Sequence, residues 1–160
     1  MKTLNFKNKQ RTGNVGLFYI GYKLSRLGWN VLPTIKNAKA IDIMAYNEKG
    51  DKISIQCKGF TNAESVGRFK EKDEIIADYF IISTNVYRKP VTYILTKDDV
   101  RNNLTKNENG YWLEKSRKKD NNFYMKDEFR EKWDKIGYGY LDIDELDQIR
   151  RIDKETILNQ

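Results

Sequence analysis

Three polar side chains in two neighbouring segments, Asp42, Gln56 and Lys58, have the types and spacing to do chemistry as catalytic residues. A carboxylate and an amide carbonyl are oxygen ligands of the kind that a hard divalent cation prefers. Hydrolysis of a phosphodiester needs such a cation, a positioned water and a nearby positive charge. We therefore predict that Asp42, Gln56 and the backbone carbonyl of Cys57 hold Mg²⁺ or Mn²⁺. Lys58 is expected to orient or help deprotonate the attacking water and to stabilise negative charge.

A β-hairpin is the element that must bring these groups together. Residues 40–46 and 52–59 both have strand-like patterns, and a polar turn joins them. The second segment alternates, which places Gln56 and Lys58 on one face of the strand and Cys57 on the other. Two paired strands would hold the polar groups within a few ångströms of one another.

Two other interpretations of these residues stay open at this stage. Each polar residue alone is often a solvated side chain at a strand edge, and Asp42 and Lys58 could form a purely structural ion pair. Asp42 lies between Ile41 and Ile43. A carboxylate buried there is costly unless a cation or a lysine compensates its charge.

The rest of the pattern predicts an α/β protein. A helix is expected over residues 14–27, capped by Thr12 or Asn14 and ended by Gly28. Further strands are expected at 30–34, 78–83 and 91–95, a short charged helix at 69–77, a helix capped by Thr96, an exposed hairpin or loop within 102–122, and an amphipathic helix at 126–136.

Composition excludes several classes of protein. The chain of 160 residues has no histidine, which excludes hydrolases with an imidazole base and the common zinc sites. Its one cysteine cannot form an internal disulfide, which fits a reducing compartment. No apolar run approaches the roughly 18 residues of a membrane span, and the first residues lack the apolar region of a signal peptide. We expect a soluble, cytoplasmic protein of one domain, with no membrane partner.

The positive charge is concentrated in the first quarter of the chain. The formal net charge is +7, and residues 1–41 hold eight basic side chains and no acidic one. Such a one-sided field suits a polyanion, most simply DNA, although a solvated basic face is the plain alternative. The candidate DNA-binding residues are Lys7, Lys9, Arg11, Lys36, Lys39, Arg68 and Lys70.

The order of these elements resembles the PD-(D/E)xK nuclease superfamily, the restriction-endonuclease-like fold. The resemblance rests on segments 12–14, 27–31, 40–43 and 54–58, and covers roughly residues 12–100. Glutamine in the second motif, Gln56-Cys57-Lys58, is similar to the Mrr-like branch, where strands ending in QxK are usual. The resemblance implies an αβββαβ core with a mixed sheet. It also implies a Mg²⁺-dependent endodeoxyribonuclease, in restriction and defence or in DNA processing.

The sequence departs from the family pattern on the first helix. Members often carry a glutamate there as a further metal ligand, whereas residues 11–24 contain no acid. Asn14 could supply a weaker, neutral oxygen as an auxiliary ligand. This departure leaves open a weak or inactive relative that acts as a DNA- or protein-binding module. A Holliday junction resolvase-like enzyme, which shares the core and the basic face, is a second alternative.

The C-terminal part of the chain lies outside the resemblance. We expect a nuclease-like core over 1–105 and a helical extension over 106–160 that packs on it. A nuclease this small is expected to cut both strands as a homodimer, with Trp112, Phe129 and Trp133 as candidate contact residues.

Overall fold

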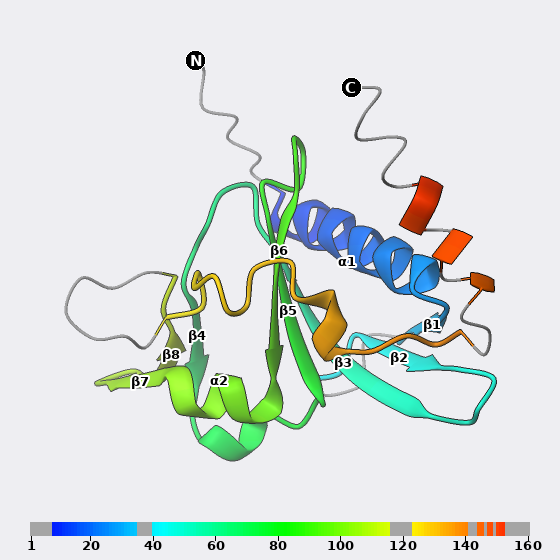
Figure 1. Ribbon diagram of the computed structural model, residues 1–160. Helices are drawn as coiled ribbons and strands as arrows, with labels where there is room; N and C mark the ends of the chain where they lie inside the picture. The colour runs from blue at the N-terminus through cyan, green and yellow to red at the C-terminus, as the bar shows by residue number, and fades with distance from the viewer. Residues whose placement is uncertain are drawn as a thin grey trace.

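A mixed five-stranded sheet forms the centre of the computed structural model, which describes residues 8–34, 40–115, 123–140, 144, 145, 147, 148 and 150–152. Its strands follow the spatial order β1-β2-β3-β5-β6 (Figure 1). They are β1 (Asn30–Pro33), β2 (Ile43–Tyr46), β3 (Lys52–Gly59), β5 (Tyr79–Thr84) and β6 (Val91–Thr96). Strands β3 and β5 are parallel, and the other neighbours are antiparallel. The hairpin expected from the sequence is thus confirmed as β2 and β3.

Helix α1 (Lys9–Arg26) covers one face of this sheet. It begins five residues before the expected residue 14, because the side chain of Asn8 caps it by accepting a hydrogen bond from the backbone N–H of Arg11 at 2.9 Å. Ile20 and Leu24 point to the sheet and are fully buried. As expected, the helix ends before Gly28, whose φ of +87° favours glycine.

Two glycines let α1 lie directly on the end of β3. A Cβ atom added to Gly16 would lie 2.6 Å from the Cα of Gly59, and one added to Gly59 would lie 2.8 Å from the backbone oxygen of Thr12. Real side chains essentially never reach such distances, so both positions require glycine. This contact fixes the first half of α1 against the strand that carries Gln56 and Lys58.

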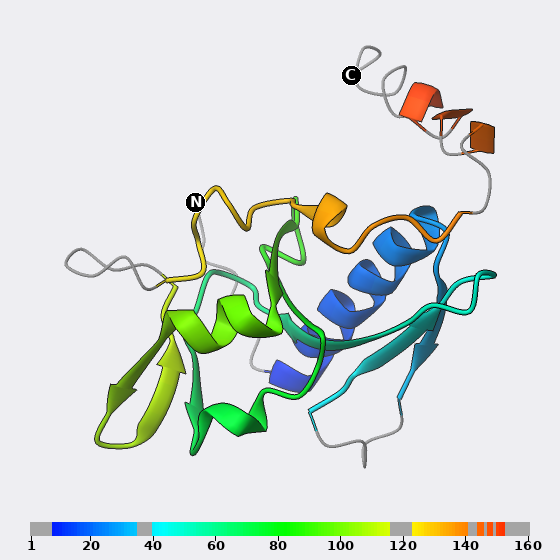
Figure 2. The ribbon, with the colours of Figure 1, turned by 60° about the horizontal axis from the view of Figure 1, so that its bottom comes forward.

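The other face of the sheet is covered by α2 (Lys97–Asn103) and by a second, three-stranded sheet. The second sheet has the order β4-β8-β7, formed by β4 (Val66–Phe69), β8 (Gly110–Leu113) and β7 (Leu104–Asn107). Figure 2 shows α1 and α2 on different sides of the five-stranded sheet. Thr96 caps α2 in a reciprocal capping box with Asp99, as its position in the sequence predicted.

The connection between the parallel strands β3 and β5 differs from the expected helix at 69–77. It contains β4 and only a short 3₁₀ helix, η1 (Lys72–Glu74). The chain from Val66 to Phe69 pairs with β8 instead of coiling, because Val66 and Phe69 are buried in the core that the second sheet covers. The α/β architecture with a mixed sheet is as predicted, but the helix expected between β3 and β5 is reduced to one 3₁₀ turn.

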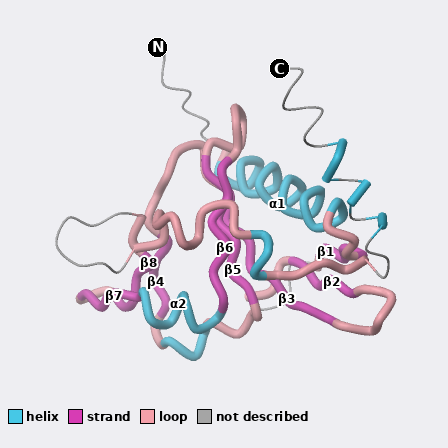
Figure 3. Tube along the Cα trace, in the orientation of Figure 1, coloured by secondary structure: helices cyan, strands magenta, loops and turns pink. Residues whose placement is uncertain are grey.

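Residues 123–140 form an extended segment, here called the strap, that crosses β6. The prediction of an amphipathic helix at 126–136 is therefore wrong. Figure 3 shows the strap mostly as loop, with one helical turn, η2 (Trp133–Lys135). The strap backbone pairs with the strand: the N–H of Ile94 donates to the oxygen of Phe129, and the N–H of Glu131 donates to the oxygen of Thr92, both at 2.8 Å. These bonds take the place of helical ones. The helical residues of the extension lie later, at 144–152 among those described.

The strap also corrects the expected dimer contacts. Phe129 and Trp133 are 2% and 8% exposed because they fill the two cores of their own domain. The hairpin expected within 102–122 is confirmed as β7 and β8, and its first strand spans the expected boundary at residue 105. Within the described part of the chain, no helix has the length and apolar character needed to cross a membrane.

Candidate active site at the start of strand β2

Asp42 lies where β2 begins, and its side chain continues the pairing with β3. Its backbone N–H donates to the oxygen of Ile55 at 2.9 Å, and its Oδ2 accepts from the N–H of Cys57 at 2.7 Å. The segment after β1 holds the backbone of Asp42 from the other side, since the N–H of Thr34 donates to the backbone carbonyl oxygen of Asp42 at 3.0 Å. The carboxylate is therefore fixed against the backbone of the QxK segment.

The backbone of β3 presents a carbonyl to the same place. The backbone N–H and C=O groups of successive strand residues alternate in direction. Those of Ile55 and Cys57 therefore point toward β2, and those of Gln56 point toward β5. Because the N–H of Cys57 meets the Asp42 carboxylate, its carbonyl opens toward the same edge. The Asp42 carboxylate and the Cys57 carbonyl, two of the three expected oxygen ligands, thus lie on the same side of β3.

Gln56 carries a buried oxygen without a partner. Its side chain is on the face opposite Cys57, beside Phe80 of β5, and the residue is 9% exposed. Among the described residues its Oε1 has no hydrogen-bond donor. A buried acceptor without a partner costs about 1–3 kcal/mol, so native proteins rarely keep one without a ligand, ion or water. This oxygen, next to the segment that holds Asp42, fits a hard cation.

Lys58 shares the Gln56 face of β3 and is half-buried beside Ile82. No ion pair within 4.0 Å joins it to Asp42, and both residues lie in the described part of the chain. The purely structural ion pair is therefore not formed. The ammonium group stays available for another negative charge.

The Cys57 thiol is not a nucleophile in this site. Burial raises its pKa well above the usual value, and the charge of Asp42 raises it further, while Lys58 lowers it. A neutral, buried thiol on the α1 side of the sheet does no acid–base work. Cys57 contacts Asp42 through its backbone N–H.

The remaining predicted ligand, Asn14, is exposed on α1. No hydrogen bond joins its side chain to Asp42, Gln56 or Lys58, all of which the structure describes. The first turn of α1 holds no acid. The role of Asn14 as an auxiliary ligand stays a prediction. Groups of three or more histidine, cysteine, aspartate or glutamate side chains that could hold a metal do not occur among the described residues.

The predicted DNA-binding residues divide into two groups and a remainder. Lys9 and Arg11 are exposed at the start of α1, and Arg68 and Lys70 are exposed on and just after β4. Lys7, Lys36 and Lys39 lie outside the described residues. Arg68 has a φ of +70° at an irregularity in the pairing of β4 with β8.

Sequence reasoning missed the glycine pair that positions β3. Gly16 and Gly59 bring α1 onto the strand one residue after Lys58. The available signals were a glycine inside an amphipathic helix and a glycine directly after the QxK segment.

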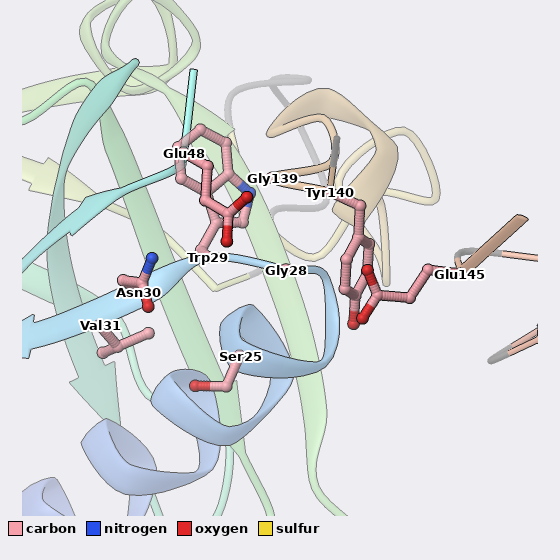
Figure 4. Close-up of a pocket in the computed structure, with 9 residues that line it drawn as sticks. All are labelled: Ser25, Gly28, Trp29, Asn30, Val31, Glu48, Gly139, Tyr140 and Glu145. Carbon is pink, nitrogen blue, oxygen red and sulfur yellow. The ribbon is translucent and has the colours of Figure 1, made fainter. Parts of the chain in front are cut away.

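A separate pocket of about 540 Å³ lies at the other end of α1. Figure 4 shows Ser25 at the end of the helix, Glu48 from the turn before β3, and Glu145 beside the ring of Tyr140. The Tyr140 hydroxyl donates to the oxygen of Arg26 at 2.7 Å, and burial, followed by the charge of Glu145, raises its pKa. Asp42, Gln56 and Lys58 do not line this pocket.

The fold is similar to that of a solved bacterial homing endonuclease, I-Ssp6803I. The likeness has a TM-score of 0.54 at 13% identity and covers 81% of this chain and 93% of that chain. No family model matches the sequence. A search of curated proteins also finds no match. The expected nuclease fold is thus supported at the level of architecture, while the PD-(D/E)xK superfamily and its Mrr-like branch stay predictions.

Proposed function

We propose that this protein is a Mg²⁺-dependent DNA endonuclease of the PD-(D/E)xK type, for which Mn²⁺ can replace Mg²⁺. The observation that carries the proposal is the unpartnered, buried Oε1 of Gln56 next to the hydrogen bond between Asp42 and Cys57. Likeness to a structure described as a homing endonuclease supports DNA as the substrate. Restriction of foreign DNA and DNA processing, in the cytoplasm, both fit this activity.

Each side chain then has a distinct task. The Asp42 carboxylate, the Gln56 amide oxygen and the Cys57 carbonyl would hold the cation, which when bound polarises a phosphoryl oxygen and lowers the pKa of water. The N–H of Cys57 keeps the carboxylate of Asp42 oriented. Lys58, which is free of an ion pair with Asp42, orients the attacking water and offsets the negative charge that develops on the phosphate.

The test is cleavage of supercoiled plasmid and of four-way-branched DNA, with Mg²⁺, Mn²⁺ or EDTA. We expect cleavage of the plasmid with either metal, none in EDTA and none by Asp42→Ala. Glu108→Ala is the matched control, because it removes an exposed carboxylate from the turn between β7 and β8. It should cleave like the wild type.

Each of the other outcomes contradicts a defined part of the proposal. Cleavage by Asp42→Ala at the wild-type rate would exclude its carboxylate as the essential ligand. Binding of DNA without cleavage at any metal concentration would favour the non-catalytic binding module. Cleavage confined to branched DNA would favour a resolvase-like enzyme.

We also propose that the endonuclease is a homodimer through the outer side of α1. Phe18 and Tyr22, one turn apart, are 65% and 56% exposed. A two-fold axis level with Ile20 would set each Phe18 against Tyr22 of the other copy, and each Arg26 against the neutral Asn14 instead of a like charge. Light scattering should show a dimer at micromolar concentration and a monomer for Phe18→Ala/Tyr22→Ala. A wild-type monomer with and without DNA would contradict this.

A further inference from the structure

The loop between β5 and β6, residues 85–90, contacts the first turns of α1. The hydroxyls of Tyr87 and Thr12 lie 3.3 Å apart in a hydrogen bond. Figure 1 shows this loop at the end of the molecule where α1 begins. The contact joins two segments that are 75 residues apart in the sequence.

The same loop is also tied to the end of β3. The N–H of Val86 donates to the oxygen of Phe60 at 3.2 Å, and the N–H of Phe60 donates to the oxygen of Ser83 at 2.8 Å. Val86 is 6% exposed, and a turn is closed by the N–H of Arg88 donating to the oxygen of Asn85 at 2.9 Å. The loop is therefore held in place by Phe60, which lies two residues after Lys58.

Three acid-free segments meet at this end of the sheet. Residues 8–34, 52–63 and 79–97 contain no aspartate or glutamate. They contribute α1, β3, and the pair β5 and β6 with its loop. At the tip of the loop, Arg88 and Lys89 are adjacent and exposed, and no ion pair engages them among the described residues.

A carboxylate that contacts β6 close to this loop already accepts two hydrogen bonds. Glu131, on the strap, accepts from the N–H of Thr92 at 2.6 Å and from the Nε1 of Trp133 at 3.2 Å. The loop tip thus presents two positive charges at the end of the molecule where β3 ends and α1 begins, the elements that carry Lys58, Lys9 and Arg11. A surface with one sign of charge next to a phosphodiester site suits the phosphate backbone of DNA.

We propose that Arg88 and Lys89 of the β5–β6 loop grip the phosphate backbone of the DNA strand that enters the candidate active site. This inference rests on the proposed endonuclease function and adds a binding element to it. Tyr87 is a positioning residue, because its hydroxyl sets the loop against Thr12 of α1. Phosphate contacts hold the strand in register and carry no sequence information.

The test is DNA binding by Arg88→Ala/Lys89→Ala, measured by fluorescence anisotropy on two duplexes of unrelated sequence in EDTA, between 50 and 200 mM salt. Each lost phosphate contact lowers the slope of log K against log salt by about 1. We expect the slope, which is negative, to become less steep by about 2, and the Kd to rise by the same factor on both duplexes.

Lys49→Ala/Lys52→Ala is the matched control. It removes the same charge at the other end of β3, where both side chains are exposed. It should keep the wild-type slope, and both variants should keep the wild-type melting temperature. A slope equal to that of the control, or a loss confined to one sequence, would overturn the inference.

These results separate the inference from the proposed function. A wild-type protein that binds and cleaves DNA, with a loop variant that binds as tightly, would overturn only the role of the loop. A wild-type protein that neither binds nor cleaves DNA would overturn both. Tighter binding of the wild type to anionic lipid vesicles than to DNA would also overturn the inference.

Discussion

Replacing Gln56 with leucine should stabilise the metal-free protein while removing its response to metal. Its Oε1 is buried without a donor among the described residues. An unsatisfied buried acceptor costs about 1–3 kcal/mol, and leucine has a similar size and no polar atom. Part of this gain is offset because Gln56 is 9% exposed, so its replacement removes some hydrated polar surface. We expect Gln56→Leu to raise the free energy of unfolding by about 1 kcal/mol in EDTA, which is about 2–4 °C in Tm for a chain of this length.

Added metal should reverse the order of the two proteins. A cation at 100 times its Kd stabilises the wild type by about 2.7 kcal/mol, or roughly 5–10 °C in Tm. Gln56→Leu lacks one of the ligands and should show little shift. Thermal unfolding in EDTA, and at about 100 times the Mg²⁺ concentration that gives half-maximal cleavage, measures both effects in one experiment.

Ser83→Ala is the matched control for this prediction. The Ser83 hydroxyl is also fully buried without a partner among the described residues, but it faces α1 instead of the candidate metal site. It should stabilise the protein in EDTA and keep the full response to metal. A Gln56→Leu protein that is less stable than the wild type in EDTA, or that responds equally to Mg²⁺, would refute the reasoning.

Three further predictions concern the elements around the site. Asp42→Asn should keep the fold, because an amide oxygen can still accept from the N–H of Cys57, and should lose metal-dependent cleavage; an unfolded far-UV spectrum would contradict this. Gly16→Ala should lower the free energy of unfolding by about 1–3 kcal/mol, since its Cβ would lie 2.6 Å from the Cα of Gly59. Gly13→Ala, whose Cβ would meet nothing within 4 Å, should raise this free energy by about 0.5–1 kcal/mol. Equal urea midpoints for the two variants would refute the close contact. Burial raises the pKa of the Cys57 thiol, so its contribution to stability is present below the unfolded value of about 8.5 and is lost as the pH rises above it; rapid labelling by a thiol reagent at pH 8 in the native state would oppose this.

The sequence by itself determined the elements whose signals are local. The alternation of residues 52–59 predicted β3 and the face shared by Gln56 and Lys58, and the Thr96 cap predicted α2. These signals depend on neighbours within one turn or one strand, so they survive without knowledge of the rest of the chain. The order of the elements was enough to suggest a nuclease fold.

Only the tertiary structure decided what depends on distant partners. The strap at 126–136 has helical spacing, yet its backbone pairs with β6, because Phe129 and Trp133 must reach two different cores. The start of α1 followed from Asn8, which the pattern of apolar residues does not include. The structure also shows, among the residues that it describes, that the Asp42 carboxylate accepts from the N–H of Cys57 and forms no ion pair with Lys58. It brings together three acid-free segments that are far apart in the sequence. Such contacts are set by the packing of the sheet, which periodicity and composition do not encode.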